Sequence, residues 1–348
     1  MSWSVEENAR AVLLPAFDGL TLSDEMRRFL DGGGVSALFG ESRSEYVARR
    51  MSDVRRSSET AHDIIQGIEA VRARSGTLLA AIDQELGGIC RLHDLVSPFP
   101  DIHSGEDLSE AEVEAACARV AQEACALGVN LFLAPVLDSL PGSNPWLEGR
   151  KMSLEPARAA RLARAYVTGV QSAGVATCSK HFPGFASVTG DPALDPQAVC
   201  DVPLEVLAAG AAPFHAAIAA GTAMMMVGPA PVTALEPRLA ALRTPAIIER
   251  LKGPFGFEGI VMADDLDAAA TLRGDSVPHV AVQALAAGCD YLLLADTGSQ
   301  LSDVVRSIMA AVDSGMLSEE ELGESARRIR SAAHRFESWS REKASNGS

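Results

Sequence analysis

The sequence predicts a single-domain α/β fold, the (β/α)8 TIM-type barrel. Short apolar runs of strand length alternate with longer segments of helical periodicity, and such alternation is typical of parallel strands. Polar or acidic residues follow several of these runs, as they do on the active-site face of a barrel. A doubly wound sheet also alternates strand and helix, but eight units in 348 residues favour closure.

The predicted strands are the apolar runs, and there is one for each unit of the barrel. We expect them to pair in parallel because a helical segment separates most neighbouring runs. The runs are Val12–Phe17, Val35–Phe39, Thr77–Ile82, Val129–Val136, Val175–Cys178, Ala223–Val227, Gly259–Met262 and Tyr291–Ala295.

The predicted helices lie between these runs. Many open with Ser, Thr or Pro and several are followed by Gly, residues that favour the start and the end of a helix. The segments are Ser23–Leu30, Ser44–Arg72, Ser109–Leu127, Glu155–Ala173, Leu204–Ala220, Thr244–Leu251, Pro278–Ala287 and Ser302–Ser314.

The chain shows no internal repeat of fixed period and no long linker, so one domain is the simplest organisation. We expect the barrel to occupy residues 11–337. The polar ends, residues 1–10 and 338–348, are predicted to be tails.

Composition excludes several functional classes. With 30 Lys and Arg against 46 Asp and Glu, the net charge of −16 excludes a basic surface for nucleic acid. The sequence has neither an apolar run long enough for a membrane span nor the pattern of a signal peptide, which predicts a cytoplasmic protein without a membrane partner. Six scattered cysteines without a CxxC pair are interpreted as reduced core residues, not as a zinc or disulfide framework.

Two carboxylates, Asp264 and Asp265, follow the run Gly259–Met262 directly. Successive residues of a strand face opposite sides, so we expect one of the two to face the mouth of the barrel. The other is expected to bond the backbone or to cap the next helix.

A cation and an imidazole follow another run, at Lys180 and His181. Together with Asp83, which follows a third strand, they are suited to hydrogen-bonding the hydroxyl groups of a sugar. Arg150 is a further candidate donor. Trp146 is a candidate for stacking on a sugar ring, with packing as the alternative.

Several blocks, taken together and in order, resemble glycoside hydrolase family 3, and within it the single-domain bacterial β-N-acetylglucosaminidases. The resemblance runs from about Leu13 to Phe336. Its blocks are Gly32-Gly33-Gly34-Val35, Ile82-Asp83-Gln84-Glu85, Ala134-Pro135-Val136-Leu137-Asp138, Gly149-Arg150, Lys180-His181-Phe182-Pro183-Gly184, Gly256-Phe257-Glu258-Gly259 leading into Asp264-Asp265-Leu266, and Ala326-Arg327-Arg328-Ile329.

The resemblance implies a retaining β-glycosidase that acts on a small-molecule glycoside or aminosugar and uses neither a metal nor an organic cofactor. Asp264 would be the nucleophile that forms a covalent glycosyl-enzyme. Asp83, Arg150, Lys180 and His181 would hold the sugar.

The sequence departs from the family where the general acid/base is expected. The family has an Asp-Ser-His triplet there, whose His is the acid; here Asp191 matches the Asp, and Ala193 fills the position of the His. No other His lies in Phe185–Asp195, and loss of a positioned acid costs about a hundred- to ten-thousand-fold in rate.

Three explanations remain open at this point. Asp191 or Asp195 acts as the acid, or the substrate has a leaving group that needs none, or the barrel binds a sugar without turning it over. A repurposed enzyme, such as a phosphorylase, a lyase or a tailoring enzyme for an aminosugar-containing metabolite, is a further alternative.

Overall fold

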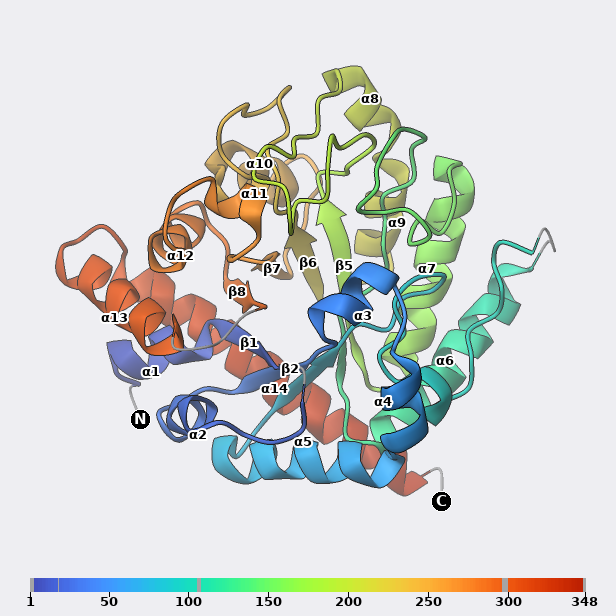
Figure 1. The fold of residues 1–348 in the computed structure, drawn as a ribbon, viewed down its shortest axis with the longest axis horizontal. Coiled ribbons are helices and arrows are strands. Elements are labelled where there is room, and N and C mark those ends of the chain that lie inside the picture. Colours follow the sequence, from blue (N-terminus) through green and yellow to red (C-terminus); the bar gives the residue numbers. More distant parts are fainter. Residues whose placement is uncertain (1–2, 18, 105–107, 296–299, 347–348) are drawn as a thin grey trace.

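The strands form one closed parallel barrel in chain order, with β8 hydrogen-bonded back to β1 (Figure 1). The computed structural model describes residues 3–17, 19–104, 108–295 and 300–346. Every predicted strand is confirmed, and so is the fold class. The strands are β1 Leu13–Phe17, β2 Ser36–Phe39, β3 Leu79–Ile82, β4 Leu131–Phe132, β5 Ala176–Phe182, β6 Met224–Val227, β7 Ile260–Ala263 and β8 Tyr291–Leu294.

The helices surround the barrel (Figure 1). Their bounds are α1 Val5–Ala11, α2 Asp24–Asp31, α3 Arg43–Ala48, α4 Asp53–Ser58, α5 Ala61–Ser75, α6 Glu110–Ala126, α7 Pro156–Ser172, α8 Leu204–Ala209, α9 Ala212–Ala219, α10 Pro245–Lys252, α11 Ala269–Leu272, α12 Val277–Ala286, α13 Gln300–Asp313 and α14 Glu319–Asn346; two short 3-10 turns lie at His93–Leu95 and Ala241–Arg243. Among the described helices, none is long and apolar enough to span a membrane.

The prediction of one helix over Ser44–Arg72 is wrong, because three helices, α3, α4 and α5, occupy this part of the chain. The side chains of Ser52 and Thr60 accept hydrogen bonds from backbone N–H groups three residues later, and each of them starts a new helix. Ser and Thr are strong N-caps, so they divide a segment that is helical throughout in its periodicity.

The predicted helix Leu204–Ala220 is likewise divided, into α8 and α9. Gly210 ends α8, and Pro213 lies in the first turn of α9. Proline fits the first turn of a helix, where its missing N–H is not needed.

Helix α14 lies against the amino-terminal end of the barrel. Its Arg328 donates to the carbonyl of Glu258, just before β7, and pairs with Asp290, just before β8. Its Arg330 donates to the side chain of Asn8 and to the carbonyl of Glu7 in α1. This end of the barrel is therefore closed, and the carboxyl ends of the strands form the open mouth.

The two segments predicted as tails are partly helical. Helix α1 begins within residues 1–10, where Ser4 and Glu7 form a capping box, and the chain stays helical in α14 to Asn346. Residues 1–2 and 347–348 lie outside the described part of the chain.

Met224, Met225 and Met226 of β6 are all buried, as expected of a barrel strand that is covered on both faces. The surrounding helices pack closely on one another. Gly169 of α7 lies so near α6 that a Cβ atom there would come within 2.4 Å of the carbonyl oxygen of Glu114. Backbone atoms cannot yield locally, so this contact requires glycine.

We predict that Gly169→Ala destabilises the protein by about 1–3 kcal/mol, because it forces α6 and α7 apart. Gly323→Ala is the matched control. It also lies in a helix, but a Cβ there meets nothing nearer than 3.6 Å. The control should stabilise the protein by about 0.5–1 kcal/mol, since alanine loses less conformational entropy than glycine in a helix. Urea unfolding measures both, and equal effects of the two substitutions would contradict the packing argument.

Candidate active site

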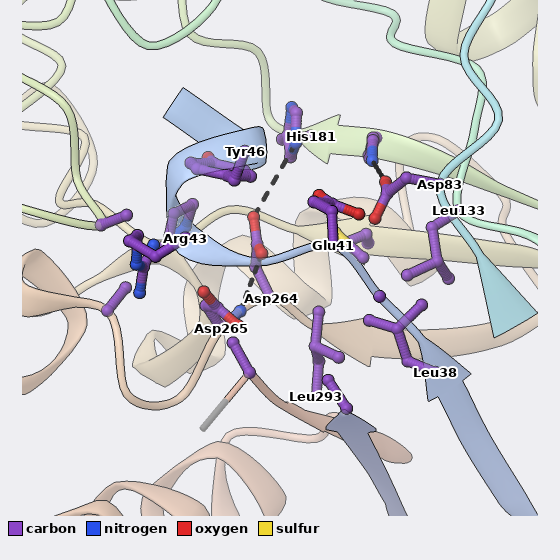
Figure 2. A pocket seen from close by; sticks show the side chains of 18 of the residues that line it. Leu38, Glu41, Arg43, Tyr46, Asp83, Leu133, His181, Asp264, Asp265 and Leu293 are labelled. Atoms are coloured by element: carbon purple, nitrogen blue, oxygen red, sulfur yellow. Dashed lines mark hydrogen bonds and ion pairs between the residues drawn. The ribbon is translucent and has the colours of Figure 1, made fainter. Parts of the chain in front are cut away.

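A cavity of about 410 Å³ opens at the carboxyl ends of the strands. Charged side chains from different units of the barrel line it, and Figure 2 shows several of them pointing toward one another. Glu41 follows β2, Asp83 follows β3, Lys180 and His181 end β5, and Asp264 follows β7. Apart from Glu41, these are the charged residues that the strand-end argument predicts.

Glu85 is the centre of an ion-pair network beneath this cavity. Its carboxylate is fully buried and pairs with Arg150, at 2.6 Å from Nη2 to Oε1, and with Lys180, at 2.9 Å from Nζ to Oε1. Lys180 also donates to Oδ1 of Asp83 at 2.5 Å. One buried carboxylate therefore holds two cations that line the cavity, one from β5 and one from the segment between β4 and α7.

The network keeps Glu85 and Lys180 charged. Burial disfavours the Glu85 carboxylate, but Arg150 and Lys180 outweigh this effect and lower the pKa of Glu85 below its ordinary value. Burial likewise disfavours the Lys180 ammonium, and Asp83 and Glu85 outweigh it and raise the pKa of Lys180. The cavity therefore presents fixed charges to a ligand, and they need no reorganisation when it binds.

Asp138, which follows β4, holds His181 in place. Its Oδ2 atom accepts from the backbone N–H of His181 and lies 2.9 Å from Nδ1, while its Oδ1 atom accepts from the N–H of Phe185. The ring of Trp146 packs on the imidazole, with centroids 4.4 Å apart. The Nε2 atom of His181 is thereby directed toward Asp264, 3.9 Å from its Oδ2 atom.

Both Lys180 and His181 line the cavity, although successive residues of a regular strand face opposite sides. The register between β5 and β6 shifts between Lys180 and Phe182. A bulge of this kind redirects side chains, and it brings two adjacent polar residues to one site.

The expectation that only one of Asp264 and Asp265 faces the cavity is wrong, because both line it. Strand β7 ends at Ala263, so the alternation of a strand no longer applies to these residues. The backbone N–H of Asp265 donates to Oδ1 of Asp264 at 2.7 Å, and Oδ2 of Asp264 is buried without a hydrogen-bond partner among the described residues. Asp264 therefore presents one uncommitted oxygen.

Asp265 lies next to Asp264 in the cavity wall. Burial, followed by the charges of Asp267 and Asp264, raises the pKa of Asp265 well above its ordinary value, although Arg43 opposes the shift. Its Oδ1 atom, like Oδ2 of Asp264, is buried without a hydrogen-bond partner among the described residues.

The loop after β5 contributes Ala193 to the cavity lining, and neither Asp191 nor Asp195. Asp191 accepts from Arg49 at 3.4 Å and from the N–H of Ala193 at 3.0 Å. Asp195 accepts from the N–H of Gln197 at 2.8 Å. The structure therefore brings the position of the expected histidine to the cavity, but not the two aspartates suggested as replacements.

Trp146 and Arg150, the remaining predicted site residues, both line the cavity. The indole N–H of Trp146 donates to the hydroxyl of Tyr46 at 2.9 Å, and the indole is almost fully buried. Its contact with His181 gives it a packing role in the cavity wall.

Three further residues, Glu41, Arg43 and Tyr46, line the cavity from the segment after β2 and were not predicted from the sequence. Glu41 lies two residues after the run Val35–Phe39, so the rule that identified Asp83 and Asp264 could have found it, whereas Arg43 and Tyr46 lie in α3. Glu41 is the most unusual of the three. Its Oε2 atom is buried without a partner among the described residues, and burial, followed by the charge of Asp83, raises its pKa to about 8.

No group of three or more His, Cys, Asp or Glu side chains is placed to hold a metal ion in the part of the chain that the structure describes. Of the carboxylates that line the cavity, Asp83 is instead paired with Lys180.

An eight-stranded barrel with a preorganised, charged cavity at its carboxyl end is typical of enzymes that bind polar small molecules such as sugars. Comparison with known proteins identifies the family. Residues 13–332 match the glycosyl hydrolase family 3 N-terminal domain. The chain belongs to glycoside hydrolase family 3.

Curated relatives support this assignment. A β-hexosaminidase of Xylella fastidiosa is 37% identical over 225 residues, which are 62% of this chain and 67% of that protein. A β-hexosaminidase of Stenotrophomonas maltophilia is 32% identical over 68% of this chain and 72% of its own length.

Solved structures agree with the fold. The family 3 β-N-acetylglucosaminidase of a Paenibacillus species has a TM-score of 0.85 and 27% identity, and the match covers 96% of this chain. This chain spans only 63% of that one. The β-N-acetylhexosaminidase of Beutenbergia cavernae, at 24% identity, has a TM-score of 0.81 and matches over 96% of this chain and 99% of its own.

The raised pKa of Glu41 predicts a pH dependence of stability. The folded protein retains a proton on Glu41 up to about pH 8, whereas the unfolded chain loses it near the ordinary value of 4.5. Between these values the folded state binds more protons, so its contribution to stability falls as the pH rises. We expect Glu41→Gln to be more stable than wild type at pH near 8, with a smaller difference at pH near 5.

Urea unfolding at the two pH values measures this difference. Glu148→Gln removes the same charge from an exposed position between β4 and α7 and serves as the control. Parallel stability curves for wild type and Glu41→Gln would show that Glu41 is ionised normally.

Proposed function

We propose that this protein is a retaining β-glycosidase of the β-N-acetylhexosaminidase type, with Asp264 as the nucleophile and an atypical substrate. The observation that carries the proposal is the free Oδ2 atom of Asp264, which is buried in the cavity beside His181. The naming of curated relatives as β-hexosaminidases supports the substrate class.

In the first step, Oδ2 of Asp264 attacks the anomeric carbon while the bond to the leaving oxygen breaks, and a glycosyl ester forms. Water then hydrolyses the ester and regenerates the carboxylate. The hydrogen bond from the N–H of Asp265 to Oδ1 orients the nucleophile, and the raised pKa of Asp265 disfavours a second negative charge beside it.

The fixed charges of Asp83, Lys180 and Arg150 are suited to binding the sugar hydroxyls, since a carboxylate accepts and a cation donates. His181 lies beside Asp264, with its Nε2 atom 3.9 Å from Oδ2, so it is placed near the reacting end of a bound sugar. Binding energy from these contacts orients the anomeric carbon over Asp264.

The leaving group is the atypical feature. Ala193 carries no proton donor, so the leaving oxygen receives a proton from Asp191 or Asp195 after a movement of their loop, or departs without one. Departure without a proton favours an aglycone that is already acidic, such as a phenol, an N-hydroxy compound or a phosphate.

The same observation favours a second candidate, a phosphorylase. Phosphate is already anionic and needs no base when it attacks the glycosyl ester, so the second step would proceed without the missing histidine. Turnover that requires phosphate would distinguish this reaction from hydrolysis.

Asp264→Ala is predicted to abolish turnover of aryl β-N-acetylglucosaminides, because no other residue forms the ester. An activated 5-fluoro glycosyl fluoride should trap the intermediate, and mass spectrometry should find the label on the peptide that contains Asp264. Asp265→Asn, which leaves Asp264 intact, is the control for labelling. A label on another residue, or turnover by Asp264→Ala, would contradict the proposal.

Aryl glycosides with good and poor leaving groups test the missing acid. If no residue acts as the general acid, turnover is restricted to substrates with good leaving groups. Asp191→Ala and Asp195→Ala then match wild type on every substrate. A replacement acid would show itself as a loss of about 10²–10⁴-fold in one of these variants, on poor leaving groups alone. Sugar binding without turnover of any aryl glycoside would favour a non-catalytic binding protein.

A further inference from the structure

Glu41 faces the cavity beside Asp83 and has no assigned role in the reaction. Figure 2 shows its carboxyl group among the polar side chains of the site, between those of Asp264 and Asp83 in this view. Its Oε2 atom is buried and lacks a hydrogen-bond partner among the described residues. A buried carboxyl oxygen without a partner is costly, so it marks a position where a ligand would supply the missing donor.

The cations near Glu41 are paired with other carboxylates. Lys180 and Arg150 form ion pairs with Asp83 and Glu85, the two carboxyl groups that act on Glu41 from the same edge of the cavity. Among the ion pairs of the described residues, none includes Glu41, so its carboxyl group has no cation of its own.

A third cation, Arg91, also acts on Glu41, but its own hydrogen bonds go elsewhere. Its guanidinium group donates to both carboxylate oxygens of Glu59 and to the carbonyl of Gly40. In the absence of a ligand, a proton on Glu41 removes the negative charge that this carboxyl group would otherwise carry.

In Figure 2, Glu41 and Asp83 both lie to one side of Asp264. Asp264 and His181 mark the reacting end. The charged groups that act most strongly on Glu41 are Asp83, Lys180, Glu85 and Arg91, and Asp264 is not among them. A sugar whose anomeric carbon lies at Asp264 would direct the far side of its ring, at C4 and C6, to Glu41 and Asp83.

We propose that Glu41 and Asp83 bind an ammonium group carried at C4 or C6 of the sugar, so that the substrate is a glycoside of a cationic aminosugar. This inference rests on the proposed function, since it takes the anomeric carbon to lie at Asp264. The ammonium group donates to the free oxygen of Glu41 and to Asp83, and supplies the cation that Glu41 lacks. Glu41 releases its proton to the solvent when the ligand binds.

An ammonium ligand fits this edge better than a hydroxyl group does. A hydroxyl group has one donor and no charge, so it leaves the proton on Glu41 and the charge balance unchanged. An ammonium group has three donors and exchanges for the proton. A site with a buried partner for the ammonium group also discriminates strongly against the ligand that lacks this group, because that ligand leaves the buried partner unpaired.

Calorimetry tests the proposal without any turnover. The probes are the methyl β-glycosides of N-acetylglucosamine with an amino group in place of the hydroxyl at C6 or at C4, each compared with the parent sugar. At neutral pH we expect one amino ligand to bind wild type at least about tenfold more tightly than the parent sugar. Titrations in buffers of different ionisation enthalpy should show that the amino ligand releases about one proton and the parent none.

Glu41→Gln should lose both the preference and the proton release, while Glu148→Gln should keep both. The glutamine variant is expected to fold, since it removes a buried carboxyl group that the folded state disfavours when ionised. A preference that persists in Glu41→Gln would overturn the proposal, and so would equal affinity for amino and parent ligands, or binding of neither.

A catalytic role for Glu41 is a separate outcome. If Glu41→Gln slows only the aryl glycosides with poor leaving groups, and azide restores the rate, then Glu41 is the general acid and the ammonium site is overturned. Failure of the proposed glycosidase reaction would instead leave turnover absent with the calorimetric preference intact, so the two failures are distinguishable.

Discussion

The buried carboxylate of Glu85 is the interaction on which the rest of the cavity depends. It follows β3 and reaches Lys180 at the end of β5 and Arg150 in the segment between β4 and α7. These three side chains come from three units of the barrel, and each of the two cations would be costly to bury without its partner. The carboxylate therefore fixes the positions of the groups that meet a ligand, and it does so below the cavity, without occupying it.

The position of this network has consequences for the remaining carboxyl groups. Lys180 is shared between Glu85 and Asp83, so it is already paired with two carboxylates. Glu41 and Asp265, which lie in the same cavity without a cation of their own, have raised pKa values because burial is not compensated. The site thus contains both charged and protonated carboxyl groups, an arrangement that glycosidases use to combine acid and nucleophile functions.

The loop after β5 separates this protein from the family pattern. Asp191 is retained, but it binds Arg49 and the backbone of its own turn, and the cavity wall contains the methyl group of Ala193. The residues proposed as binding groups and nucleophile, Asp83, Arg150, Lys180, His181 and Asp264, line the cavity around Ala193. Their retention is expected of a cavity that recognises a glycoside, and in the proposed reaction the substitution at Ala193 affects the step in which the leaving group is protonated.

The sequence by itself determined the barrel and most of its charged lining. Strand periodicity is local, and the carboxyl ends of parallel strands converge, so Asp83, Lys180 and Asp264 could be assigned to one site. The tertiary structure alone decided which oxygen is free, which carboxyl group carries a proton and that both Asp264 and Asp265 face the cavity. These properties depend on distances between units far apart in the chain, such as that between Glu85 and Arg150, which no local pattern encodes.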